Sequence, residues 1–124
     1  MNGIDFFVDT NVLLYMLEKH PAVSTMSKFS LAVSAITEIE LLGKKNITLH
    51  EENKMRGILK GCEIIDFSNT IKDIAISIKQ KYTVKIPDAI IVATAKLFDL
   101  PLITADKELK KIEGVDIVIL DLNH

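Results

Sequence analysis

Four acidic residues lie near the ends of predicted strands or near the starts of predicted helices. They are Asp9 after FFV, Glu40 in a short helix, Asp88 at the start of an apolar segment, and Asp106 after LITA. Carboxylates that lie within a few ångströms of one another take up protons unless a cation neutralises them. Mg²⁺ or Mn²⁺ would suit such a site, because hard ions prefer oxygen ligands. Such ions could activate water for attack on a phosphodiester bond and stabilise the leaving oxygen.

Each acid also has an ordinary structural interpretation. Asp9 and Asp106 precede predicted helices, and aspartate is among the best helix N-cap residues. Asp88 would interact favourably with the positive end of a helix dipole whatever else it does. Glu40 competes with Glu38, because a helical wheel leaves both at the borders of the apolar stripe. The pattern alone does not choose between the two glutamates.

The elements that must position these acids alternate between strand and helix. Apolar runs predict strands over 4–8, 31–35, 63–67, 102–104 and 116–120. Helical spacing and capping residues predict helices over 12–19, 22–28, 36–42, 51–59, 70–81, 89–98 and 107–112. This alternation predicts an α/β fold, doubly wound, with a mostly parallel central sheet and helices on both faces. Ligands bind beyond the carboxyl ends of such strands, so we expect the acids to converge at that edge.

Length and composition limit the possible classes of protein. The 124 residues predict one domain, 1–124, with 48% hydrophobic residues and a net charge of -2. A broad basic surface for nucleic acid is therefore not expected, and Arg56 is the only arginine, so contacts to phosphate must come mainly from lysine or metal. Lys44, Lys45 and Lys85 could contribute, although Lys44 and Lys45 more simply face solvent.

The same composition predicts a cytoplasmic protein. Cys62 has no partner for a disulfide, and His20, His50 and His124 are scattered rather than spaced as zinc ligands. No apolar stretch approaches the roughly 18 to 20 residues that cross a bilayer. The first ten residues lack the basic segment followed by an apolar one that is typical of a signal peptide.

Four segments of the chain, taken together, resemble a known family. VDTNVLL, SAITEIELLG, PDAIIVATA and LITADKEL, in this order, resemble the PIN-domain family, in particular its VapC-type toxins, over essentially the whole chain. The resemblance implies a metal site built from Asp9, Asp88, Asp106 and a glutamate, which the register of ELLG places at Glu40. It also implies that three small polar residues line this site: Thr10, Asn11 and Thr104.

The resemblance implies a function as well as a fold. It points to a Mg²⁺- or Mn²⁺-dependent endoribonuclease that leaves a 5'-phosphate and acts as the toxin of a toxin–antitoxin system. Asp9 and Asp88 would be the central metal ligands, Glu40 a ligand or base toward the attacking water, and Asp106 a ligand acting mainly through water. The implied partners are the RNA substrate, a second copy of the chain, and an antitoxin that places a basic side chain in the acidic pocket.

Other interpretations of the acids remain. A phosphatase of the haloacid dehalogenase kind needs a second aspartate where Asn11 stands. A response-regulator receiver domain needs a pair of acids after the first strand, which is missing, and a phosphoacceptor aspartate in mid-chain, for which Asp66 is the only nearby candidate. No glycine-rich phosphate loop is present. A non-catalytic PIN-like binding module, or a PIN nuclease that processes RNA outside a toxin–antitoxin pair, stays open. The sequence does not identify the RNA target.

Overall fold

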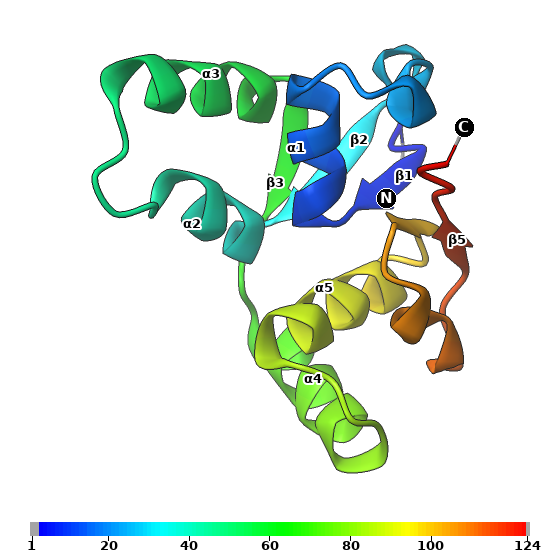
Figure 1. Ribbon diagram of the computed structural model, residues 1–124. Helices are drawn as coiled ribbons and strands as arrows, with labels where there is room; N and C mark the ends of the chain where they lie inside the picture. Colours follow the sequence, from blue (N-terminus) through cyan, green and yellow to red (C-terminus); the bar gives the residue numbers. More distant parts are fainter. Residues whose placement is uncertain (1–2, 124) are drawn as a thin grey trace.

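The central feature of the fold is a five-stranded parallel sheet. The computed structural model describes residues 3–123, and its strands are β1 (Phe6–Val8), β2 (Leu31–Ser34), β3 (Cys62–Ile65), β4 (Leu102–Thr104) and β5 (Ile117–Ile119). They lie in the order β3-β2-β1-β4-β5, and each neighbouring pair is parallel (Figure 1). The predicted α/β class and parallel sheet are confirmed.

Five α-helices and three 3₁₀ turns connect the strands. The helices are α1 (Thr10–Leu17), α2 (Ala35–Leu42), α3 (Leu49–Lys60), α4 (Asn69–Lys81) and α5 (Ile86–Leu97), and the turns are η1 (Pro21–Val23), η2 (Met26–Lys28) and η3 (Lys107–Lys111). The short helices predicted over 22–28 and 107–112 are 3₁₀ helices in the structure, and the first of them is divided into two turns. Both segments are too short to repay the cost of starting an α-helix, so they form the tighter turns that short pieces adopt.

Local capping chemistry explains where several helices begin and end. Ser34 accepts a hydrogen bond from the Ile36 amide at the start of α2, and Ser68 accepts one from the Ile71 amide at the start of α4. Gly43 follows α2, and a Cβ at that position would collide with the carbonyl oxygen of Ile39. The predicted stop of α2 at this glycine is confirmed.

The core consists of two apolar layers, one on each face of the sheet. Alternate side chains of each strand point to opposite faces, so Phe7 packs in one layer and Val8 in the other. The Phe7 layer is covered by α4 and α5, and the Val8 layer by α1 and α3. The helix α5 is buried on most sides, and α4 lies against its outer side, as Figure 1 shows. In residues 3–123 no helix has the length and apolar character needed to span a membrane.

Candidate active site

The order of the strands places the ends of β1 and β4 side by side. The chain runs from β1 to β2 in one direction and returns from β3 to β4 on the other side of β1, so the topology switches between β1 and β4. Ligand sites of open α/β sheets lie at such switch points, beyond the carboxyl ends of the strands. Asp9 directly follows β1, and Asp106 follows β4 by two residues. The fold therefore brings these two acids to one edge.

Asp9 stands at the N-cap position of α1, but its side chain makes no capping hydrogen bond. Asp9 is only 6% exposed, and its Oδ2 accepts a hydrogen bond of 2.7 Å from the hydroxyl of Thr104. A buried carboxylate is costly unless hydrogen bonds or a cation compensate it. The simple interpretation of Asp9 as a helix cap therefore does not explain where its side chain lies.

Thr104 connects the two acids at the ends of β1 and β4. Its fully buried hydroxyl donates to Asp9 and accepts a hydrogen bond of 3.0 Å from the backbone amide of Asp106. Asp106 is exposed, and its Oδ1 accepts a hydrogen bond of 3.0 Å from the amide of Glu108 at the start of η3. For Asp106 the capping interpretation is correct, although one cap does not use up the acceptor capacity of a carboxylate.

Glu40 and Glu38 lie in different environments. The hydroxyl of Thr10 donates a hydrogen bond of 2.6 Å to Oε1 of Glu40 and lies 2.8 Å from the hydroxyl of Thr37. Because a threonine hydroxyl carries one hydrogen, Thr37 must be the donor toward Thr10. Glu38 lines a separate groove between α2 and α3, where Arg56 also lies. The helix therefore presents Glu40, and not Glu38, to the residues that follow β1.

Asp88 occupies the third position of α5, after Ile86 and Pro87. Its carboxyl group is half-buried, and this burial is the largest cause of a raised pKa. The negative charges of Asp9, Asp106 and Glu40 raise the pKa further, in that order, and the charge of Lys85 lowers it. The four acids are thus close enough to interact electrostatically, and we call Asp9, Glu40, Asp88 and Asp106 the carboxylate edge.

The chemistry of the carboxylate edge fits a hard divalent cation. All four candidate donors are carboxylates, which favour Mg²⁺ or Mn²⁺ over zinc. Within residues 3–123, no group of three or more histidine, cysteine, aspartate or glutamate side chains is arranged to hold a metal ion by itself. Mg²⁺ does not require such a cage, because it is usually held by one or two carboxylates together with waters and substrate phosphate. The residues present fit that open mode of binding.

The supporting residues predicted from the sequence divide into two groups. Thr10 and Thr104 hydrogen-bond to acids of the carboxylate edge, whereas Asn11 is exposed at the second position of α1. Thr37 is an addition that the sequence analysis missed. It lies three residues before Glu40, on nearly the same face of α2, and this spacing of polar residues in an apolar helix was the available signal.

The lysines near the site also differ in their roles. Lys44 forms an ion pair with Glu51 in the first turn of α3, which favours the simple structural interpretation of that lysine. Lys85 is exposed at the N-cap of α5, and its charge acts on Asp88. Lys85 is therefore better placed than Lys44 to meet an anionic ligand at the carboxylate edge.

Comparisons with known proteins agree with this arrangement. The family model described as PIN domain matches residues 6–115. A chain in a toxin–antitoxin complex from Klebsiella pneumoniae is 33% identical, with a TM-score of 0.78, over 92% of this chain and 96% of that one.

Two further solved structures share the fold. VapBC2 from Rickettsia felis, bound to a promoter DNA fragment, has 23% identity and a TM-score of 0.77 over 95% of this chain and 100% of its own. FitAcB from Neisseria gonorrhoeae has 23% identity and a TM-score of 0.77 over 96% and 99%. No curated protein matched the sequence.

Proposed function

The chain belongs to the PIN-domain family, and from this premise we propose that it is a metal-dependent endoribonuclease, the toxin of a toxin–antitoxin pair. PIN domains are generally nucleases, and the domain here would be the whole of residues 1–124. The observation that carries the proposal is the convergence of four carboxylates, three of which raise the pKa of the fourth. A cation bound between acids that repel one another would offset this repulsion and keep the acids ionised.

The proposal assigns each acid a role in holding the ion. Asp9 and Asp88 would bind Mg²⁺ or Mn²⁺ directly, and Asp106 would support it from the end of β4. When bound, the ion would activate water and offset negative charge on the phosphodiester. Hydrolysis of the bond would leave a 5'-phosphate on one product. Glu40 would accept a proton from the attacking water, while the hydroxyl of Thr10 holds its Oε1 in place.

The charge of the protein is consistent with this assignment. The chain has a net charge of -2, so binding of an RNA backbone cannot rest on a broad basic surface. A bound divalent ion is the largest local positive charge in such a site. Lys85, at the start of α5, would add a second contact to phosphate.

The partners in the proposal follow from the solved relatives. The relative from Klebsiella pneumoniae comes from a toxin–antitoxin complex, and those from Rickettsia felis and Neisseria gonorrhoeae share the fold. We extend this to the present chain as binding to an antitoxin that covers the carboxylate edge with a basic side chain, together with formation of a homodimer. We further propose that the protein acts in the cytoplasm, where its RNA substrate is found.

The experiment that tests the proposal compares two glutamates on one helix. Purified protein should cleave RNA in Mg²⁺ or Mn²⁺ and lose this activity in chelator, in Asp9→Asn and in Asp88→Asn. Glu40→Gln should lower kcat by about 10² to 10⁴, the usual contribution of a general base. Glu38→Gln is the matched control and should cleave at the wild-type rate. Cleavage that resists chelator, or that survives in the aspartate variants, would show that the proposed mechanism is wrong.

Expression in cells separates the toxin role from nuclease activity alone. Growth arrest that disappears in Asp9→Asn but persists in Glu38→Gln supports a toxin. A protein that cleaves RNA in vitro but leaves growth unaffected would instead support an RNA-processing nuclease. A protein that binds RNA without cleaving it in any divalent metal would support the non-catalytic binding module.

A further inference from the structure

Two threonines and one glutamate form a hydrogen-bond network that joins α1 to α2. The hydroxyl of Thr37 donates to the hydroxyl of Thr10 over 2.8 Å, and the Thr10 hydroxyl donates to Oε1 of Glu40 over 2.6 Å. Thr37 and Thr10 are buried, whereas Glu40 is exposed. The hydrogen bonds therefore lead from the core outward to the carboxylate edge. We call these residues the Thr37–Thr10–Glu40 network.

We propose that Thr37 is a positioning residue for Glu40. It fixes the direction of the Thr10 hydroxyl and, through it, the place of the carboxylate that accepts the proton of the attacking water. The inference rests on the proposed nuclease function and adds to it a residue that is too deeply buried to touch the substrate. It is argued from the number of hydrogens in the network, from the burial of Thr37 and from the few contacts of Glu40.

The number of hydrogens in the network fixes its direction. An ionised glutamate has no hydrogen to donate, so the contact between Thr10 and Glu40 uses the single hydrogen of the Thr10 hydroxyl. That hydroxyl then offers only lone pairs to Thr37, and their contact is a hydrogen bond only if Thr37 donates. With Thr37 in place, the Thr10 hydroxyl has a donor on one side and an acceptor on the other. Without Thr37, nothing on the inner side of Thr10 keeps its hydrogen directed at Glu40.

Thr37 uses its hydroxyl differently from Thr94, the buried threonine of α5. Thr94 donates a hydrogen bond of 2.7 Å to the carbonyl of Ile90, one turn earlier in the same helix. Thr37 is the third residue of α2, so the carbonyl four residues earlier belongs to Val33 in β2 and not to a turn of the helix. The hydroxyl of Thr37 instead reaches across to α1. The bond of Thr94 satisfies its own side chain, whereas the bond of Thr37 also acts on a second helix.

Glu40 has few contacts that could hold its carboxylate in place. Its side chain is long and exposed, and restricting such a side chain to one rotamer is costly in entropy. Within residues 3–123, the Thr10 hydroxyl is the only hydrogen-bond donor to Glu40, and the glutamate forms no ion pair. Thr37 lies three residues before Glu40 on nearly the same face of α2, so the helix itself sets the spacing between the first donor and the last acceptor.

The network also sets Glu40 relative to Asp9. Thr10 directly follows Asp9, and the Asp9 carboxylate is held separately by the hydroxyl of Thr104. The three strands that lead to these residues, β2, β1 and β4, are neighbours in the sheet. Loss of the Thr37 hydroxyl should therefore displace Glu40 and leave Asp9 in place. We expect the proton-transfer step to slow while substrate binding stays unchanged.

A double-mutant cycle in the full chain tests the proposal. Thr37→Val keeps the shape of the side chain without the hydroxyl, and kcat for RNA cleavage in Mg²⁺ should fall about tenfold with KM unchanged. Thr37→Ser keeps the hydroxyl and should recover most of the rate. In a Thr10→Val background, Thr37→Val should lower kcat by less than about twofold, because Thr37 acts only through Thr10. Thr94→Val is the matched control, since it removes another buried hydroxyl and should cleave at the wild-type rate.

A second measurement does not depend on activity. The ¹³C chemical shift of the Glu40 carboxylate is recorded by NMR in metal-free protein. Thr37→Val and Thr10→Val should move this signal in the same direction, whereas Thr37→Ser and Thr94→Val should leave it near the wild-type value. Thermal unfolding checks that each variant is folded. If Thr37→Val does not fold, Thr37→Cys, whose thiol is only a weak donor, replaces it in both measurements.

The outcomes distinguish this inference from the proposed function. The inference is wrong if Thr37→Val lowers kcat by the same factor with and without Thr10→Val, or if Thr37→Ser is as slow as Thr37→Val. It is also wrong if the Glu40 signal in Thr37→Val stays at the wild-type value. If the wild type cleaves RNA in no divalent metal, the nuclease proposal fails, and the Glu40 signal alone then decides whether Thr37 positions that carboxylate.

Discussion

The carboxylate edge and an apolar groove between α4 and the first turns of α5, which we call the α4–α5 groove, are shaped by different forces. At the carboxylate edge, buried threonine hydroxyls fix the acids: Thr104 binds Asp9, and Thr10 binds Glu40.

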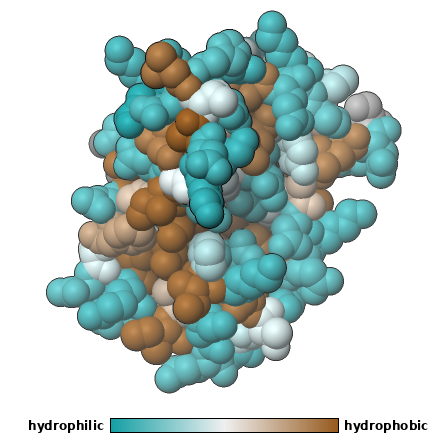
Figure 2. Space-filling view, turned by 60° about the vertical axis from the view of Figure 1, so that its left-hand side comes forward, coloured by the Kyte–Doolittle hydropathy of each residue, from teal (hydrophilic) through white to brown (hydrophobic). Residues whose placement is uncertain are grey.

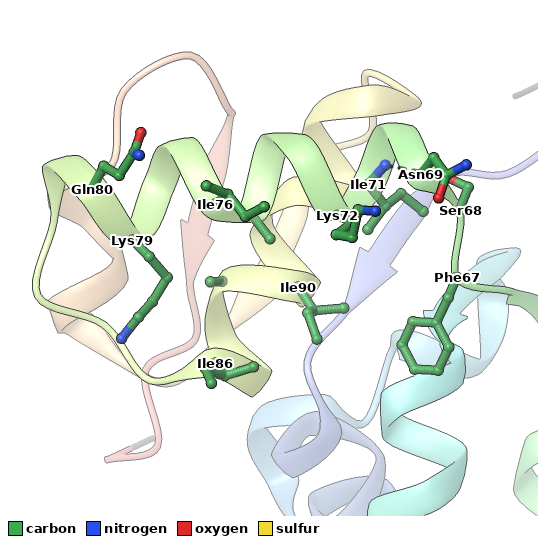
Figure 3. Close-up of a pocket in the computed structure, with 12 residues that line it drawn as sticks. Phe67, Ser68, Asn69, Ile71, Lys72, Ile76, Lys79, Gln80, Ile86 and Ile90 are labelled. Atoms are coloured by element: carbon green, nitrogen blue, oxygen red, sulfur yellow. Dashed lines mark hydrogen bonds between the residues drawn. The ribbon is translucent and has the colours of Figure 1, made fainter.

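The α4–α5 groove is lined mainly by apolar side chains. Such side chains gather in Figure 2 at the height where Figure 1 places α4 and α5. Ile76, Ile86 and Ile90 are directed toward the space between the two helices (Figure 3), and in the single chain Ile76 and Ile86 are 48% and 63% exposed. The carboxylate edge therefore needs precise hydrogen bonds, whereas the groove needs only a surface of suitable shape. Substitutions in the two regions should have different effects on activity and stability.

The largest effect is expected from removing one charge at the carboxylate edge. Asp9→Asn keeps an oxygen that can accept from Thr104 but loses the negative charge that would hold the cation. We expect RNA cleavage to fall by at least about a hundredfold, a loss that appears in kcat. Steady-state kinetics with one RNA substrate separates kcat from KM.

A control for this prediction is Asp73→Asn, which changes an exposed acid on α4, the helix that forms one wall of the groove. Its kinetics should match those of the wild type. If Asp73→Asn lowered kcat as much as Asp9→Asn, the two regions would not have the separate roles that their structures suggest.

A smaller effect on activity, together with a loss of stability, is expected from Thr104→Val. Valine has nearly the same shape but removes the hydroxyl that donates to Asp9 and accepts from the Asp106 amide. Leaving a buried carboxylate without its donor costs about 1 to 3 kcal/mol in the free energy of unfolding. Cleavage should fall about 10- to 100-fold, as is usual for residues that orient metal ligands. Chemical denaturation and the cleavage assay measure both.

Thr104→Ser keeps the hydroxyl and serves as the matched variant. It should recover most of the activity and stability that Thr104→Val loses. Equal losses in both variants would mean that packing of the threonine methyl group, rather than the hydrogen bonds, is what this position provides.

The sequence predicted the carboxylate edge better than it predicted the groove, for physical reasons. Parallel strands deliver the residues that follow them to one edge, so Asp9 and Asp106 could be placed from the strand pattern alone. Glu40 could not be separated from Glu38 by pattern, because the choice depends on the contact between Thr10 and α2. That glutamate was assigned only by family resemblance.

The groove depends on how α4 packs against α5, and helical periodicity does not fix this packing. Helical spacing predicts the helix over 70–81 but does not tell which of its apolar residues stay open to solvent, as Ile76 does, and which are buried, as Ile71 and Ile78 are. The short helices predicted over 22–28 and 107–112 could not be identified as 3₁₀ for a related reason, since a short periodic segment does not reveal which hydrogen-bonding pattern it adopts.

The pH dependence of stability should show what it costs to ionise Asp88, which is half-buried and faces three other acids. Because the pKa of Asp88 is raised in the folded protein, the folded state binds more protons than the unfolded state in the range just above the normal pKa of aspartate. In metal-free protein, Asp88 therefore reduces stability as pH rises through its folded pKa. Asp88→Asn should make the metal-free protein more stable at neutral pH, although the same variant loses activity.

The difference in melting temperature between wild type and Asp88→Asn should shrink as the pH falls below the pKa of Asp88. Mg²⁺ should raise the melting temperature of the wild type more than that of the variant, because the variant lacks one of the four negative charges that a bound cation would offset. A wild type that is more stable than the variant at neutral pH without metal would contradict the electrostatic description of the carboxylate edge.

The smallest effect is expected from Ile76→Thr in the groove. Ile76 is half-exposed on α4, and threonine keeps its branched shape, so the free energy of unfolding should change by no more than about 0.5 kcal/mol. Ile71→Thr on the same helix is the matched contrast: Ile71 is 3% exposed, and placing a hydroxyl there should cost about 1 to 3 kcal/mol. Both are measured by denaturation at two protein concentrations. If Ile76→Thr were as costly as Ile71→Thr, and only at high concentration, Ile76 would be buried between two copies of the chain. The groove would then be an interface between copies of the chain. It would serve assembly, while the carboxylate edge alone would serve catalysis.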